Sequence, residues 1–151
     1  MNPTLHSGRG RTRSLEVALD QEGLTPDEQF ELDTLHKADE ARTDCIARMK
    51  AIGVRLICGS NSGRDLYPMG GFQHEIEAHA GAGMTPMEAI VSATRDAARA
   101  CRLDNSVGTL EAGKLADILV VDGDPSQSIS ALWDVVDVFR AGEMVDRGNY
   151  L

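Results

Sequence analysis

The sequence predicts an α/β fold that is followed by a short strand-rich segment, and three observations point to it. Thr25 and Thr85 each open the pattern Thr-Pro-x-Glu, in which Thr caps a helix, Pro takes its first position and Glu closes a capping box. Residues 54–58 form a β-branched run that stops in the Gly/Ser-rich residues 59–63, as a buried strand of an α/β unit does. Three further strand-like runs follow residue 105, at 107–110, 117–121 and 135–139.

The longest predicted helix begins at the first capping box. Apolar residues recur at spacings of three, four and seven from Leu32 to Ile52, which predicts a helix from Thr25 to about Ala51. Gly53 then separates this helix from the strand-like run. Shorter helices are predicted over 14–21, 72–82 and 85–101, and residues 3–5 are expected to end a strand.

The composition is that of an ordinary globular chain with an acidic surface. Against 15 Lys and Arg stand 24 Asp and Glu, a net charge of −9, which argues against binding to nucleic acid or to an anionic membrane. No apolar run approaches the ~20 residues of a membrane span, and the N-terminus does not resemble a secretory signal. The cysteines Cys45, Cys58 and Cys101 are widely spaced, which fits reduced thiols and a cytoplasmic localisation.

Several motif-like patterns have plainer interpretations. Residues 108–114 match G-x-x-x-x-G-K, but Leu115 stands where a phosphate-binding loop needs Ser or Thr, so a turn between strands is expected. His74 and His79 are five residues apart, which leaves their rings ~140° apart on a helix, and both are expected to be partly exposed. Cys58 is expected to fill the core.

A solvated loop, with an anion site as the alternative, is expected for the basic residues Arg9, Arg11 and Arg13.

The loop of residues 59–63 is the strongest candidate for a functional site. Ligands of α/β folds collect at the carboxyl ends of strands, and Asn61 lies in the loop that directly follows the predicted strand 54–58. A purely structural turn is the alternative, and spacing alone leaves both interpretations open.

Several segments together resemble the metal-dependent amidohydrolases, especially the imidazolonepropionase-like and Xaa-Pro-dipeptidase-like members. The most specific is the block Gly-Thr-Leu-Glu-Ala-Gly-Lys-Leu-Ala-Asp at 108–117, which also explains the false phosphate loop. The resemblance covers nearly the whole chain and rests on residues 2–5, 53–63, 82–90, 93–98 and 107–125.

This resemblance implies a partial (β/α)8 barrel with the C-terminal strands of a small β-sandwich. By resemblance, residues 3–5 end the seventh barrel strand and residues 54–58 form the eighth. Residues 1–105 would be the C-terminal part of the barrel, and residues 106–151 would be strands of the sandwich. A complete barrel takes ~250 residues, so the chain resembles the last third of such an enzyme.

The resemblance also implies which residues would serve a catalytic site. In the family, divalent metal ions such as zinc are held mainly by residues of earlier strands, together with an Asp in the loop after the eighth strand. Asn61 stands at that Asp position, and an amide oxygen coordinates weakly and supplies neither negative charge nor a useful base. Asn61 is therefore a degenerate catalytic and metal position, and no metal is expected on this chain alone. Candidate substrate-binding residues nearby are Gly63, Arg64 and Tyr67.

The function implied by the resemblance is hydrolysis of carbon–nitrogen bonds in small amides or dipeptides by metal-activated water. The chain is expected to be truncated and inactive alone. One alternative is a non-catalytic subunit or relic that pairs with itself or with a separately encoded N-terminal barrel portion, because barrel strands without neighbours leave open edges. Another is a degraded or mis-started reading frame.

Overall fold

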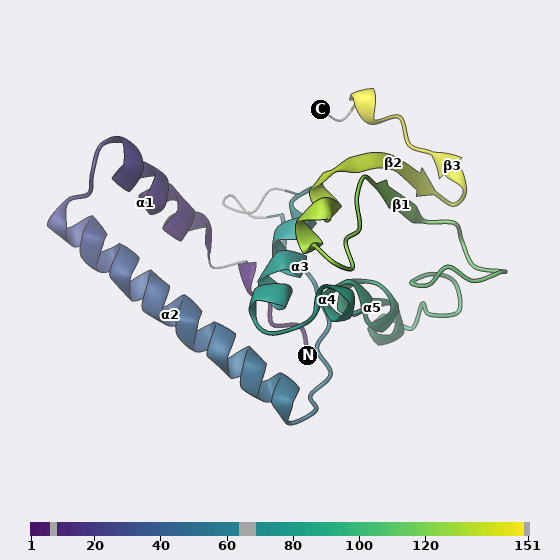
Figure 1. Cartoon of the computed structure of the whole chain (residues 1–151), viewed down its shortest axis with the longest axis horizontal. Coiled ribbons are helices and arrows are strands. Elements are labelled where there is room, and N and C mark those ends of the chain that lie inside the picture. Colours follow the sequence, from purple (N-terminus) through teal and green to yellow (C-terminus); the bar gives the residue numbers. More distant parts are fainter. Residues whose placement is uncertain (7–8, 64–68, 150–151) are drawn as a thin grey trace.

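The computed structural model describes residues 1–6, 9–63 and 69–149, and places the helices before the sheet (Figure 1). The helices are α1 (Arg9–Gln21), α2 (Pro26–Ala51), α3 (Phe72–Gly81), α4 (Pro86–Ala93) and α5 (Arg95–Ala100). The strands are β1 (Ile118–Val121), β2 (Val135–Arg140) and β3 (Glu143–Met144). Two 3-10 helices, η2 (Ile129–Trp133) and η3 (Arg147–Asn149), lie in the same half of the chain. The fold is thus α/β, as the sequence predicts.

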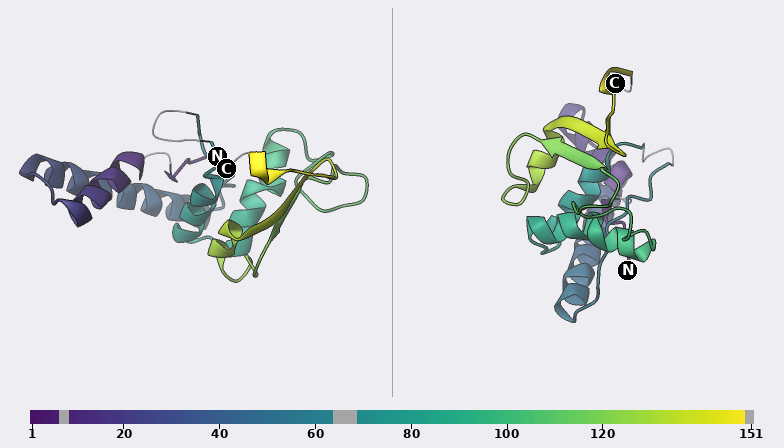
Figure 2. Two further views of the ribbon diagram at one scale, coloured as in Figure 1. Left: turned by 90° about the horizontal axis from the view of Figure 1, so that it is seen from above. Right: turned by 90° about the vertical axis from the view of Figure 1, so that its right-hand side faces the viewer.

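Helices α1 and α2 form an arm that projects from the rest of the molecule (Figures 1 and 2). The predicted loop over Arg9, Arg11 and Arg13 is wrong, because α1 begins at Arg9 rather than near Ser14. Arg9 pairs with Asp39 of α2 through two hydrogen bonds of 3.0 and 2.6 Å, and Arg11 pairs likewise with a second α2 carboxylate. These pairs hold the first turns of α1 against α2.

Helix α2 has the start that the sequence predicts. The Thr25 side chain accepts a hydrogen bond from the Glu28 backbone N–H, and the Glu28 carboxylate accepts one from the Thr25 N–H at 3.0 Å. The same reciprocal bonds between Thr85 and Glu88 open α4. Both predicted capping boxes are confirmed.

The two predicted barrel strands are not regular strands, which corrects the expectation for residues 3–5 and 54–58. The segments nevertheless pair as parallel strands do at one point, because the Met1 amino group donates to the Arg55 carbonyl and the Ile57 N–H donates to the Met1 carbonyl. In this register the next donor to residues 54–58 would be the N–H of residue 3, and Pro3 has none. The side chain of Asn2 also lies against Gly59, where an added Cβ would be 2.5 Å from its amide nitrogen.

The predicted helix 85–101 is divided into α4 and α5 at Thr94. Its backbone (φ −118°, ψ −89°) leaves the helical region, and its hydroxyl donates to the Ile90 carbonyl. Such a bond from Thr to the preceding turn competes with regular helix geometry.

The C-terminal sheet is antiparallel in the order β1-β2-β3, with Ile118 opposite Phe139 in β2. The strand expected at 107–110 is wrong. Gly108 instead has φ +94° and lies so close to α5 that an added Cβ would be 2.6 Å from the Ala98 Cβ. One sheet is present in the part of the chain that the structure describes, so the paired sheets of a sandwich stay a prediction.

The core lies on both sides of α3. One cluster contains Leu5, Ile46, Leu56, Ala78 and Ala82, and joins α2 and both extended segments to this helix. The second cluster contains Cys58, Ile76, Ala89 and Leu132, and joins the same helix to α4 and η2. None of the helices among the described residues has the length and apolar character needed to cross a membrane.

Candidate functional site

The loop of residues 59–63 lies at the end of the extended segment, as predicted. Asn61 is exposed and has φ +52°, a left-handed conformation that Asn tolerates better than most residues. Gly63 is exposed with φ +105°, where a side chain would be strained. The Ser62 hydroxyl donates to the Ser60 hydroxyl oxygen at 2.6 Å. The loop thus presents an exposed amide and an exposed glycine.

The remaining residues of the predicted substrate site fall outside the described residues. Arg64 and Tyr67 belong to the segment 64–68, so their assignment stays a prediction. Nothing in the geometry of Asn61 and Gly63 tests their assignment either.

A second polar centre lies inside the molecule, where Glu75 of α3 has no exposed surface. Its two carboxylate oxygens each accept a backbone hydrogen bond of 2.6 Å, one from the N–H of Leu5 and one from that of His6. Successive N–H groups of this kind form an anion-binding nest. The neighbouring Thr4 has φ +47°, a strained conformation for a β-branched residue. Glu75 therefore fixes the chain direction after the first extended segment.

The predicted partial exposure of His79 is wrong, because this side chain is completely buried. Residues 75 and 79 are one helical turn apart, so both side chains leave α3 on the same face. Cys58 is 4% exposed and lies beside them, as the core prediction requires. Burial raises the pKa of the Cys58 thiol, and the nearby Glu75 carboxylate adds to that rise. The four-residue spacing of Glu75 and His79 is visible in the sequence and places both on one helix face. It does not show that this face is buried or that Cys58 lies against it.

A stack of aromatic rings joins three parts of the chain near α3. The rings of His6 and His74 stack with centroids 4.6 Å apart, and Trp133 of η2 lies 4.5 Å from His74 at a tilt of 56°. The Trp133 indole N–H donates to Glu77 at 2.8 Å. Burial lowers the pKa of His6, and the neighbouring His74 lowers it further.

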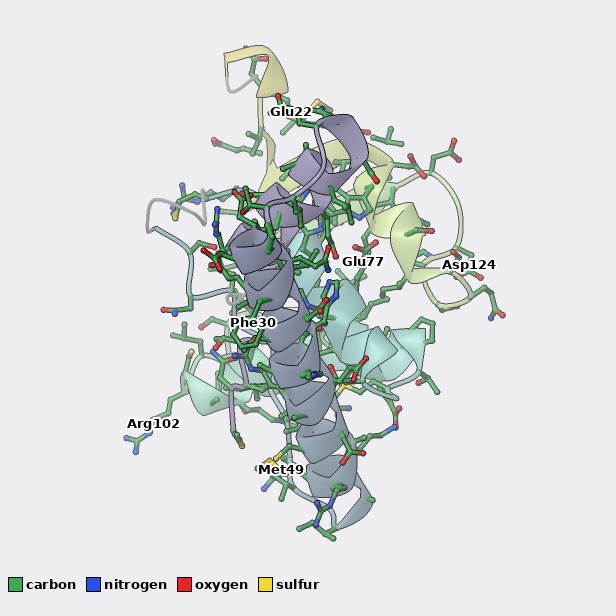
Figure 3. All side chains as sticks on the ribbon, turned by 90° about the vertical axis from the view of Figure 1, so that its left-hand side faces the viewer. Glu22, Phe30, Met49, Glu77, Arg102 and Asp124 are labelled. Carbon is green, nitrogen blue, oxygen red and sulfur yellow. The ribbon has the colours of Figure 1, made fainter. Side chains whose placement is uncertain are left out.

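A cavity of about 660 Å³ lies between the arm and α3. Its wall includes His6 and His74 together with Glu77, which Figure 3 labels beyond the long α2. Arg9 and Asp39 also line it, but they are paired with each other. The cavity is mixed in charge, so it favours no single class of ligand.

The loop 59–63 does not fit the catalytic metal ion that the amidohydrolase resemblance implies. It offers one exposed amide, whereas activation of water needs several fixed ligands on one ion. Within ranges 1–6, 9–63 and 69–149, one group of three His, Cys, Asp or Glu side chains has its ligand atoms close together, and it includes no residue of this loop.

Comparison with known proteins gives a consistent assignment. The sequence model of the amidohydrolase family matches residues 19–145. Adenine deaminase 2 from Jannaschia sp. (strain CCS1) is 36% identical over 97 residues, which is 64% of this chain and 15% of that protein.

Solved structures agree in fold. A Xaa-Pro dipeptidase with bound methionine matches 96% of this chain and 34% of its own, at 26% identity and a TM-score of 0.74. Phenylurea hydrolase B matches 68% of this chain and 26% of its own, at 28% identity and a TM-score of 0.63. Ochratoxinase of A. niger matches 89% and 31%, at 25% identity and a TM-score of 0.60. The chain thus spans about a third or less of the proteins it matches here.

Proposed function

Because this chain belongs to the amidohydrolase family, we propose that it contributes the closing segment of a catalytic unit that hydrolyses carbon–nitrogen bonds. This family is generally metal-dependent, and the water-activating metal would be held by strands of the unit other than those present here. The relatives' names refer to adenine, to Xaa-Pro dipeptides and to phenylureas, so the substrate is proposed only as a small carbon–nitrogen compound.

The observation that carries this proposal is the contrast at Asn61. The loop occupies the end of the second extended segment beside Asn2 of the first, where the family places a carboxylate, but the side chain is an uncharged amide. An amide accepts no proton near neutral pH, so it cannot take one from water. The chain by itself is therefore proposed to bind or orient a substrate at this loop and not to hydrolyse it.

The direct test is an activity screen of the purified chain with added Zn(II) or Mn(II). Dipeptides, N-acyl amino acids and cyclic amides would be offered, and no turnover above a protein-free control is expected. Robust turnover that disappears in Asn61→Ala would contradict the proposed inactivity.

A second test supplies the rest of the unit. When the remaining barrel strands of a relative are co-expressed with this chain, Asn61→Asp is expected to increase metal-dependent hydrolysis over the unsubstituted chain. Asn61→Ala serves as the matched control, since it removes the amide without adding a carboxylate. Equal activity of the Asp and Ala variants would remove the assignment of Asn61 to the ligand position.

A non-catalytic pairing subunit is the alternative, and the exposed apolar side chains of the sheet favour it. Leu119, Val136 and Met144 are all exposed, as are Leu110 and Leu115 before the sheet. Contiguous apolar patches on a protein surface commonly mark contact with a partner, and Leu119 and Val136 lie on one face of the sheet. Light scattering tests this alternative: a dimer or a complex is expected, and a compact monomer over a wide concentration range would count against it.

A further inference from the structure

The strongest unassigned feature is the buried polar group formed by Cys58, Glu75 and His79. Their ligand atoms, one from each side chain, all lie within 4.8 Å of one another. Cys58 comes from the extended segment after α2, and the other two come from successive turns of α3. Each side chain is buried, with exposures of 4%, 0% and 0%. The three groups therefore meet away from bulk solvent.

His79 supplies an independent sign that a ligand is missing. Both of its ring nitrogens are buried, and neither has a hydrogen-bond partner among the described residues. Buried polar atoms without a partner are rare because their desolvation is not compensated. Nε2 is 3.3 Å from Oε1 of Glu75, but the two do not form a hydrogen bond. The ring thus approaches the carboxylate without being satisfied by it.

The separation of these two atoms suits a shared metal ion. With zinc bonds of about 2.05 Å to nitrogen and about 2.1 Å to oxygen, a tetrahedral site places the two ligand atoms about 3.4 Å apart. The observed 3.3 Å agrees with this value. The corresponding distance from the cysteine sulfur is about 3.6 Å, so the 4.8 Å limit leaves at most about 1.2 Å to close.

We propose that Cys58, Glu75 and His79 bind one zinc ion as a buried structural site. A thiolate, an imidazole and a carboxylate are a ligand set that zinc accepts, and the thiolate disfavours Mg²⁺ or Ca²⁺. On binding, the Cys58 thiol releases its proton to solvent, so the site fills more readily as the pH rises.

The site would hold together the segments that define the core. Its ligands join residues 54–58 to α3, and Glu75 also keeps Leu5 and His6 in place through its two backbone hydrogen bonds. A carboxylate oxygen has more than one lone pair, so these bonds leave Glu75 able to bind the ion. The proposal departs from the sequence prediction that this chain alone holds no metal, and it is separate from the family's catalytic position at Asn61.

The first test uses Co(II) as a probe in the full chain. The protein would be unfolded with a chelator, refolded with Co(II), and examined for the near-ultraviolet charge-transfer absorption of a thiolate–Co(II) bond. We expect this absorption at about one ion per chain, and its displacement by Zn(II). Absence of the absorption in the folded wild-type chain overturns the proposal without the need for any variant.

The second test assigns the ligands with matched cysteine variants. Cys58→Ser is expected to abolish the absorption, whereas Cys45→Ser and Cys101→Ser, at exposed thiols, leave it unchanged. His79→Gln is expected to weaken Zn(II) binding more than about 100-fold, because loss of an outer-sphere partner alone costs 10–100-fold. Asn61→Ala is the control for the family position and should bind zinc as the wild type does. An absorption that survives Cys58→Ser, or that is lost in Asn61→Ala, overturns the assignment.

Discussion

The arm of α1 and α2 and the junction around α3 place their charged groups in opposite surroundings. In the arm, Arg11 forms a forked pair with Glu31 at the protein surface, and Arg9 forms a half-buried one with Asp39. In the junction, Glu75 is completely enclosed and binds two backbone N–H groups. Surface pairs contribute little because water and salt screen them, whereas an enclosed carboxylate leaves two donors unsatisfied if it is removed.

The difference indicates how the two regions respond to change. The arm buries few side chains, and Phe30 of α2 remains 74% exposed (Figure 3). The apolar residues that it buries outside the core clusters are Leu15 of α1 and Leu32 of α2. The junction, by contrast, belongs to the two core clusters on α3. Loss of an arm contact should therefore act locally, and loss of a junction contact should act on the whole fold.

The largest effect is expected for Glu75→Gln. An amide offers one acceptor where the carboxylate offers two, so its N–H₂ group must face the N–H of either Leu5 or His6. We expect a loss of about 4 kcal/mol in the free energy of unfolding, measured by urea denaturation. The matched control is Glu77→Gln on the same helix, which retains an acceptor for Trp133 and should cost about 0.5 kcal/mol or less. Equal effects of the two substitutions would remove the distinction between junction and surface.

A smaller and more local effect is expected for Leu15→Ala in the arm. Leu15 is buried in α1, and removal of its side chain leaves a cavity that costs about 3 kcal/mol. Hydrogen exchange should become faster in α1 and in the first half of α2 while α3 keeps its protection. Leu19→Ala, at an exposed position of the same helix, should change little. If α3 also loses protection in Leu15→Ala, the arm and the junction form one cooperative unit.

The same capping motif occurs in both regions, at Thr25 in the arm and at Thr85 before α4, so its effect on stability can be compared between them. Thr25→Ala and Thr85→Ala should each cost about 1 kcal/mol, because each leaves a helix N–H without its acceptor. The effect at Thr85 should be the larger, since Glu88 also accepts a 2.7 Å bond from Lys50 of α2, and loss of the Thr85 hydroxyl removes one of the hydrogen bonds that orient this carboxylate. Substitution by Ser in either position should restore most of the stability. A larger loss at Thr25 would contradict this order.

The sequence predicted those parts of the fold that short-range chemistry determines. Thr25 and Thr85 predict the starts of their helices, because Thr, Pro and Glu form the capping box within one helical turn. The resemblance to amidohydrolases likewise identified the family, since the block at 108–117 is specific. The start of α1 is not evident from the sequence, because Arg9 and Arg11 meet carboxylates that lie 30 and 20 residues further along the chain.

The buried group of Cys58, Glu75 and His79 could not be predicted from sequence patterns either. The partners of Glu75 are backbone groups about 70 residues away, and no local spacing encodes that approach. His79 was expected to be partly exposed because His is commonly so on helices, but Cys58 and the core around α3 enclose it. The strand prediction at 54–58 identified an extended segment and overestimated its pairing, since Pro3 removes a donor from the neighbouring segment.

The smallest effect is expected at the surface pair of Arg11 and Glu31. The hydrogen bonds from Arg11 lower the pKa of Glu31 below its ordinary value. The stabilisation is therefore present above the unfolded-state pKa of about 4.3, and it is lost as the pH falls through the lower folded-state pKa. Arg11→Gln should lower the urea midpoint slightly at neutral pH and converge with the wild type in acid.

Salt and a charge-matched variant separate this pair from a general charge effect. Added salt should reduce the difference between Arg11→Gln and the wild type, because both side chains are exposed to solvent. Arg42→Gln, at an exposed position of α2, changes the net charge equally and should not show the same acid-dependent convergence. If the two variants follow one pH profile, the pair contributes only through net charge. Stability of the arm would then come from burial of side chains such as Leu15 and Leu32 rather than from this ion pair, which would sharpen the contrast with the enclosed Glu75.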